Sequence, residues 1–121
     1  MKFICYPKCT TCQKARKWLE AWQMDFEQRD IKEEQPTEDE LRLWIRLSGL
    51  PVRKFFNTSG LKYKELKLKD RLPDMSEDEQ IALLATDGML VKRPILIAGG
   101  EGGQPGRVLV GFKEAQWEEL L

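Results

Sequence analysis

The feature that most constrains this chain is a C-x-x-C pair set between a short strand and a helix. Residues 3–6 are apolar and β-prone, so they predict a strand. Beyond Cys12, apolar residues recur at the spacing of one helix face. Cys9 therefore stands where a strand turns into a helix.

This position gives the Cys9 sulfur a chemical bias. Thr10 is the expected N-cap of the helix, and Gln13 is placed to complete a capping box. Cys9 would then lie just before the first turn, where free N–H groups and the helix dipole favour a thiolate. Lys8 and Lys14 add positive charge nearby. The pattern predicts a reactive thiol at Cys9.

Other uses of the cysteines are less consistent with the sequence. A zinc site needs two further Cys or His ligands, but the chain has no His and its third cysteine is Cys5. A structural disulfide across so short a loop gains little closure entropy, although it remains an alternative. Cys5 is expected to be a small buried hydrophobe on the strand. We therefore expect no metal and a redox or nucleophilic Cys9–Cys12 pair.

Composition excludes several classes of function. The 121 residues suit a single domain spanning 1–121, and 20 basic residues balance 20 acidic ones. A nucleic-acid binder would have an excess of basic residues, so no direct nucleic-acid contact is expected. No apolar run reaches the roughly 20 residues of a membrane span, and the N-terminus shows no signal peptide. Three cysteines without an export signal predict a cytoplasmic protein.

Four stretches are predicted to form strands. Residues 26–31 would lie parallel to the first strand after a right-handed crossover. Residues 95–98 and 107–110 suggest a hairpin. The Gly-rich stretch 99–106 between them is predicted to be a loop and not a phosphate-binding motif, because it joins no strand to a helix. Residues 113–121 would form a closing amphipathic helix.

The middle of the chain, about residues 36–88, is predicted to be an all-helical insertion between two β-containing parts, about 1–35 and 89–121. Thr37 with Glu40 and Ser76 with Glu79 form capping boxes at two helix starts. Gly49 is expected to end the first of these helices. Residues 70–74 are expected to be loop.

Four runs carry a family resemblance: Tyr-Pro-Lys-Cys-Thr-Thr-Cys-Gln-Lys-Ala at 6–15, Phe-Asn-Thr-Ser-Gly at 56–60, Lys-Arg-Pro-Ile-Leu-Ile at 92–97 and Gly-Arg-Val-Leu-Val-Gly-Phe at 106–112. In this order the chain resembles the arsenate reductase (ArsC) family of the glutaredoxin-linked type, with its Spx-type relatives. The resemblance covers nearly the whole chain. It implies an α/β, thioredoxin-like (glutaredoxin-like) fold with a central mixed sheet, flanking helices and the helical insertion.

The resemblance also implies roles for individual residues. Cys9 matches the family's nucleophile and Cys12 the second cysteine of its redox-active members. Thr10 and Thr11, between the two cysteines, would be structural parts of the site.

An oxyanion site is implied in the same way. Arg93 matches an oxyanion-binding arginine, Pro94 a cis-proline, and Arg107 a second oxyanion arginine. One position departs from the family pattern. Ser59 stands in the region where arsenate reductases carry a further arginine, and the nearest arginine is Arg53.

The expected function is that of a thiol-dependent oxidoreductase, and specifically of an arsenate reductase. The Cys9 thiolate would attack arsenate or a disulfide, and Cys12 or an external thiol would resolve the adduct. No bound cofactor is expected, only an external reductant: glutathione with glutaredoxin, or thioredoxin. The alternative is an Spx-type redox-sensing regulator that binds the RNA polymerase α subunit.

Overall fold

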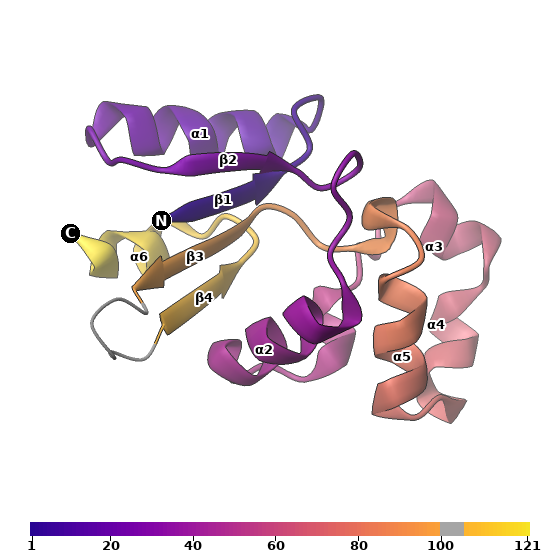
Figure 1. Cartoon of the computed structure of the whole chain (residues 1–121). Helices are drawn as coiled ribbons and strands as arrows, with labels where there is room; N and C mark the ends of the chain where they lie inside the picture. Colours follow the sequence, from indigo (N-terminus) through magenta and orange to yellow (C-terminus); the bar gives the residue numbers. More distant parts are fainter. Residues whose placement is uncertain (100–105) are drawn as a thin grey trace.

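A mixed four-stranded sheet forms the centre of the computed structural model, which describes residues 1–99 and 106–121. The strand order is β2-β1-β3-β4, with β1 parallel to β2 and antiparallel to β3, and β3 antiparallel to β4 (Figure 1). This confirms the predicted mixed sheet, its parallel pair and its hairpin. The prediction for the Gly-rich stretch falls largely on residues 100–105, outside the described part. The strands are β1 Lys2–Cys5, β2 Glu27–Asp30, β3 Ile95–Gly99 and β4 Gly106–Val110.

Two helices cover one face of this sheet. Helix α1, Thr10–Ala21, and the short α6, Glu114–Trp117, pack over the side chains of Phe3 and Leu96. Trp117 is fully buried, and its indole Nε1 donates to the Gly111 carbonyl at 3.2 Å. The closing helix is shorter than predicted, because a 3-10 turn, Glu118–Leu120, replaces its second half.

The helical insertion covers the opposite face. Side chains alternate along a strand, so Ile4, Ile95 and Val108 point away from α1 and pack against the insertion. The predicted helical stretch is confirmed, and its segments surround one apolar cluster. Its α-helices are α2 Glu38–Ser48, α3 Leu61–Glu65, α4 Leu68–Arg71 and α5 Glu77–Leu84, and its 3-10 turns are Val52–Phe55, Leu72–Asp74 and Gly88–Leu90.

The helix ends in the insertion follow the sequence signals in most places. Both predicted capping boxes form, at Thr37 and at Ser76, and Gly49 ends α2 in the left-handed conformation. The loop predicted at residues 70–74 is wrong: α4 runs directly into a 3-10 turn. Leu68 and Leu72, four residues apart on one helix face, are both buried there, so tertiary packing overrides the local loop signals.

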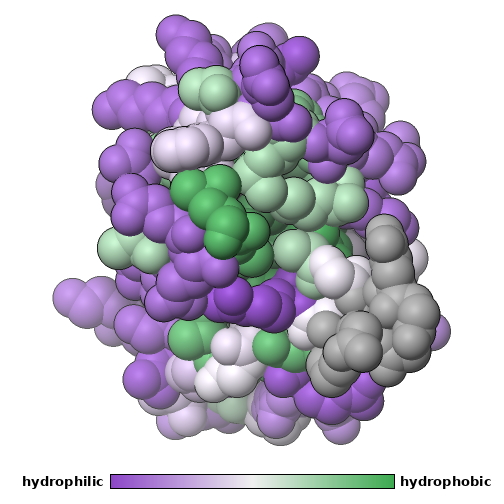
Figure 2. Space-filling model, turned by 90° about the vertical axis from the view of Figure 1, so that its left-hand side faces the viewer, coloured by the Kyte–Doolittle hydropathy of each residue, from purple (hydrophilic) through white to green (hydrophobic). Residues whose placement is uncertain are grey.

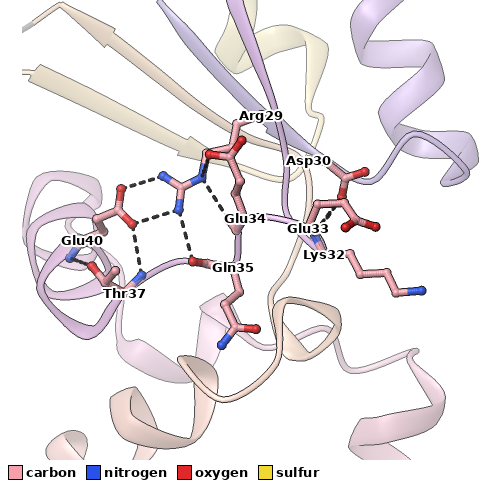
Figure 3. A network of polar contacts seen from close by, with 8 residues as sticks. All are labelled: Arg29, Asp30, Lys32, Glu33, Glu34, Gln35, Thr37 and Glu40. Carbon is pink, nitrogen blue, oxygen red and sulfur yellow. Dashed lines mark hydrogen bonds and ion pairs between the residues drawn. The ribbon is translucent and has the colours of Figure 1, made fainter.

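One polar network ties β2 to the insertion (Figure 3). Arg29 of β2 donates to both carboxylate oxygens of Glu40, at 2.6 and 2.9 Å, and to the carbonyls of Glu34 and Gln35. Its guanidinium also lies over the Trp44 ring at 5.9 Å. Because Glu40 is also part of the α2 capping box, the network joins the sheet edge to the start of α2.

The outer surface includes an apolar area on the face that carries the C-terminal end of α1 and both chain ends. Figure 2 shows apolar side chains gathered on this face. Trp22, at the end of α1, is 54% exposed, and Leu121 is 59% exposed. No helix in the described residues is long and apolar enough to cross a membrane.

Candidate active site

Cys9 is the N-cap residue of α1. Its backbone is extended, with φ −81° and ψ 126°, and its carbonyl accepts from the Gln13 N–H at 3.0 Å, which starts the helix. No side chain caps this end of α1 within the described residues. The first N–H groups of the helix are therefore left for an anion, and the half-buried Cys9 sulfur is the nearest side-chain group.

The predicted capping box at this end is wrong. Thr10 is the first helical residue and not the N-cap, so the helix starts one position earlier than the sequence suggests. Gln13 turns back to donate from Nε2 to the Pro7 carbonyl at 3.0 Å. This bond closes the loop between β1 and α1 and places Cys9 closer to the helix end than predicted.

Cys9 lies on the wall of an open cleft of about 920 Å³. The cleft is formed where the α1 end meets the insertion and the segments around β4. Six basic and two acidic side chains line it, so its field favours an anionic ligand. The charged side chains are Arg53, Lys54, Lys62, Lys92, Arg93 and Lys113, with Glu65 and Asp87.

Arg93 is a cation of the cleft whose guanidinium is held by neighbouring groups. Its guanidinium stacks over the Tyr6 ring at 5.3 Å, and Nη1 donates to the Met89 carbonyl at 3.3 Å. Its Nε is buried and has no hydrogen-bond partner among the described residues. A buried donor without a partner is costly, so Arg93 has capacity for an acceptor that enters the cleft.

Cys12 lies on the inner side of α1 and is 1% exposed. A side-chain hydrogen bond with Cys5, then burial, raise the pKa of the Cys12 thiol above its ordinary value. The Tyr6 backbone N–H donates to Cys12 Sγ at 3.3 Å. This bond and a hydrogen bond with Cys9 lower the pKa of Cys12, but they are weaker than the two effects that raise it. All three cysteines are free thiols in the structure. The C-x-x-C therefore pairs a thiol facing the cleft with a neutral thiol beneath it.

The structure brings most of the predicted site residues together. Cys9, Thr11 and Arg93 line the cleft. Pro94 follows Arg93, is buried, and the bond between them is cis, as the resemblance implies. Thr10 is exposed at the first helical position.

Arg107 is not brought into this cleft. It lies on β4, half of its side chain is exposed, and Nη2 donates to Glu119 at 3.0 Å. We therefore leave Arg107 out of the proposed oxyanion site. Lys8 and Lys14, predicted to add charge near Cys9, do not line the cleft either.

The sequence alone does not identify the other cations of the cleft. Arg53 lines it from the 3-10 turn Val52–Phe55, near Ser59, where the family pattern has an arginine. From the sequence, Arg53 is identified only as the arginine nearest to Ser59 and is given no role in the site. Lys62, Lys92 and Lys113 come from three separate segments, and nothing in the sequence distinguishes them from the other lysines of the chain.

The comparisons with known proteins agree on one family. A model described as the ArsC family matches residues 5–120. The chain is 40% identical to a solved structure titled a possible arsenate reductase from Streptococcus mutans UA159, with a TM-score of 0.85 over 99% of this chain and 97% of that one. The thioredoxin-like arrangement predicted from the motifs is therefore confirmed.

Curated relatives include proteins of different kinds. The chain is 53% identical to the uncharacterized protein YusI of Bacillus subtilis, over 98% of this chain and 96% of that protein. It is 32% identical to the regulatory protein MgsR of the same species, over 90% and 87%. Proteins named global transcriptional regulator Spx are similar at 24–27% identity.

Proposed function

Because this chain belongs to the ArsC family, we propose that it is a thiol-dependent oxidoreductase whose nucleophile is Cys9. The single observation that carries the proposal is the position of Cys9. Cys9 is the N-cap residue of α1, whose start has no side-chain cap, and it lies on the wall of a cationic cleft, where a thiolate and an anionic substrate are both favoured.

Two kinds of electrophile suit this nucleophile. With a disulfide, Cys9 Sγ attacks one sulfur, an S–S bond to Cys9 forms, and the other sulfur leaves as a thiolate. With arsenate, Cys9 Sγ attacks the arsenic, an As–S bond forms, an As–OH bond breaks, and the hydroxyl leaves as water with the proton of the Cys9 thiol. A second thiol then attacks Cys9 Sγ, so that a disulfide forms, the As–S bond breaks and the arsenic leaves as arsenite. Arg93 would hold a carboxylate or oxyanion of either substrate through its charged donors.

The size and charge of the cleft favour the disulfide. A volume of about 920 Å³ is at the upper end for a small-molecule pocket, so it has room for a peptide-sized anion as well as a bare oxyanion. Leu61 is 78% exposed on the cleft wall, and Leu50 and Val110 add apolar surface beside the cations. We infer that the substrate carries both anionic and apolar groups.

Resolution of the Cys9 adduct requires a second thiol. Cys12 interacts with Cys9 and would close a Cys9–Cys12 disulfide, releasing the substrate thiol. A neutral, buried thiol is a slow nucleophile, so an external thiol competes for the same adduct. Glutathione with glutaredoxin, or thioredoxin, would return the protein to its reduced state. The proposed reaction needs no bound cofactor, and it would require a reducing compartment such as the cytoplasm to keep the thiols reduced.

A coupled assay tests the proposal. The protein is supplied with arsenate or with a small-molecule disulfide, and NADPH consumption is followed with a glutathione–glutaredoxin system and separately with a thioredoxin system. We expect turnover of the disulfide with at least one system and its loss in Cys9→Ser. Arg42→Ala is the control, because Arg42 pairs with Asp78 outside the cleft. Wild-type rates equal to those without protein, for both substrates, contradict the proposal.

A second candidate function follows from the relatives that are named as regulators. In that case the cationic cleft would face an acidic surface of RNA polymerase, such as its α subunit, and oxidation of Cys9 would change the affinity. Co-purification with the α subunit, in a manner that depends on the redox state and is absent in a Lys62→Glu/Lys92→Glu variant, would favour this candidate over the enzyme.

A further inference from the structure

Cys5 is the one cysteine that the proposed reaction leaves unused. Its side chain is 2% exposed and lies at the end of β1. Alternation along the strand places Cys5 and Phe3 on the face beneath α1, while Ile4 points to the insertion. Cys12 projects from α1 into the same cluster. The strand and the helix thus bury two thiols against each other.

Contacts around Cys12 show how close these thiols are. The Cys5 and Cys12 side chains are joined by a hydrogen bond. The N–H of Tyr6, the residue that follows Cys5, donates to Cys12 Sγ at 3.3 Å, which fixes this sulfur against the end of β1. Cys12 also interacts with Cys9. All three cysteines thus belong to one cluster, and Cys12 has hydrogen-bond interactions with both of the others.

We propose that the redox site contains three thiols and that Cys5 takes over the disulfide from Cys9. The inference rests on the proposed function, which supplies the Cys9–Cys12 disulfide. In the added step the Cys5 thiol gives up its proton and its sulfur attacks Cys12 Sγ. The Cys9–Cys12 bond breaks, a Cys5–Cys12 bond forms, and Cys9 leaves as a thiolate that can take the proton. The protein gains and loses no electrons in this exchange.

Two features of the structure favour this direction of exchange. Cys9 is the N-cap residue of α1, and a helix start favours a leaving group that departs as an anion. Cys5 and Cys12 are almost fully buried, so a disulfide between them is shielded from thiols in solution. The oxidised protein would therefore keep a free Cys9 that faces the cleft and can attack a second substrate molecule.

Tryptic peptides distinguish the two disulfides. Cleavage after Lys2, Lys8 and Lys14 places Cys5 on the peptide 3–8, and both Cys9 and Cys12 on the peptide 9–14. The full-length reduced protein is treated with one equivalent of glutathione disulfide. Free thiols are then blocked with iodoacetamide, and the digest is analysed by fragmentation mass spectrometry without reduction.

The expected product is peptide 3–8 linked to peptide 9–14 through Cys12, with Cys9 carrying the alkyl group. An internal disulfide in peptide 9–14 with alkylated Cys5 would overturn the three-thiol proposal and leave the proposed function standing. A digest with no disulfide or glutathione adduct on any cysteine would overturn both.

Variants test the exchange without relying on Cys9 chemistry. In Cys9→Ser, oxidation with diamide should still link the two peptides, and full alkylation of Cys5 and Cys12 would contradict the proposal. In Cys5→Ala and Cys5→Val, Cys9 should become protected from alkylation after oxidation. Cys5→Ala leaves a small cavity and Cys5→Val fills it. If Cys9 is protected in both variants, the protection results from loss of the Cys5 thiol and not from a change in packing.

Discussion

The three thiols of this molecule differ in their surroundings although they lie within eight positions of one another in the sequence. Cys9 is half-buried, is the N-cap residue of α1 and faces the cleft, whereas Cys5 and Cys12 are buried in the cluster beneath the helix. A hydrogen bond between the two buried thiols lowers the pKa of Cys5, against the effect of burial, and together with burial raises the pKa of Cys12. In the proposal, Cys9 is the thiol that attacks the substrate, and Cys12 and Cys5 are the buried thiols that then exchange with it.

Substitution of the cysteines should separate these roles. Cys9→Ser removes the nucleophile, and we expect disulfide reduction to fall to the rate without protein. Cys12→Ser keeps the nucleophile, so activity should persist and become more dependent on the concentration of external thiol. Steady-state rates at several glutathione concentrations measure both. Equal loss in the two variants, with no glutathione dependence, would mean that Cys12 is required for the first step.

Arg93 should contribute to substrate binding. Arg93→Ala removes charged donors from the cleft, which are each worth about 1.5–3 kcal/mol when paired, so kcat/KM for an anionic disulfide should fall roughly 10- to 100-fold. Arg93→Lys should recover only part of this, because an ammonium cannot form two parallel hydrogen bonds. The matched control Arg42→Ala, in an exposed pair outside the cleft, should retain the wild-type value. A neutral disulfide should show a smaller effect.

At the scale of elements, the site depends on how the helical insertion is held against the sheet. The cleft takes residues from α1, from the insertion and from the segments beside β4, so their relative placement determines its shape. The Arg29 network holds the start of α2 to β2 (Figure 3). Gly88 provides a second junction, where the last 3-10 turn of the insertion approaches the chain after β2.

Loss of the Arg29–Glu40 pair should lower stability in a way that depends on pH. Its hydrogen bond with Arg29, first among several causes, lowers the pKa of Glu40 from its ordinary 4.5 to about 2. A depressed carboxyl pKa contributes stability that is present above about 4.5 and lost as the pH falls toward about 2. We expect Arg29→Ala to cost about 1–3 kcal/mol at pH 7, after allowance for partial exposure, and little at pH 2.

Urea unfolding at several pH values measures this difference. Arg42→Ala is again the control, since its pair with Asp78 is exposed and should contribute little at any pH. A cost for Arg29→Ala that does not change between pH 7 and pH 2 would show that packing on Trp44, and not the ion pair, holds the junction.

Gly88→Ala should disrupt the second junction. A Cβ at this position would lie 1.8 Å from the Ile31 carbonyl oxygen, which is backbone and cannot move aside alone. Gly49→Ala is the comparison: it meets nothing within 4 Å but sits at φ +70°, so it is strained only locally, by about 1 kcal/mol. Thermal unfolding should show a larger fall in Tm for Gly88→Ala, and a smaller or equal fall would mean that the junction shifts at little cost.

For the molecule as a whole, the sequence predicts correctly most features that depend on residues close together in the chain. The capping boxes at Thr37 and Ser76 and the helix end at Gly49 follow from neighbouring residues. The parallel pair and the hairpin follow from short-range patterns, whereas the order β2-β1-β3-β4 of the whole sheet was not predicted. The start of α1 was misplaced by one residue, because Gln13 bonds the Pro7 carbonyl across the loop and Thr10 caps nothing.

The cleft itself could be predicted only in part. Cys9 and Arg93 belong to recognisable motifs, but Lys62, Lys92 and Lys113 meet only when distant segments fold together. Arg107 shows the reverse case. Its motif implies an oxyanion site, yet its strand turns the side chain toward Glu119. The contact of Cys5 with Cys12 likewise needs the packing of α1 on β1, which no spacing in the sequence shows.

Trapping of the first covalent adduct tests the central claim most directly. In Cys12→Ser the bond between Cys9 and a substrate thiol has no Cys12 to resolve it, so it should accumulate when the protein is mixed with glutathione disulfide. Rapid acid quench and peptide mapping then identify the modified sulfur. The account predicts a glutathione adduct on Cys9. This adduct should form more slowly when Arg93→Ala is combined with Cys12→Ser. An adduct on Cys5, or no adduct while the protein remains folded, would contradict it.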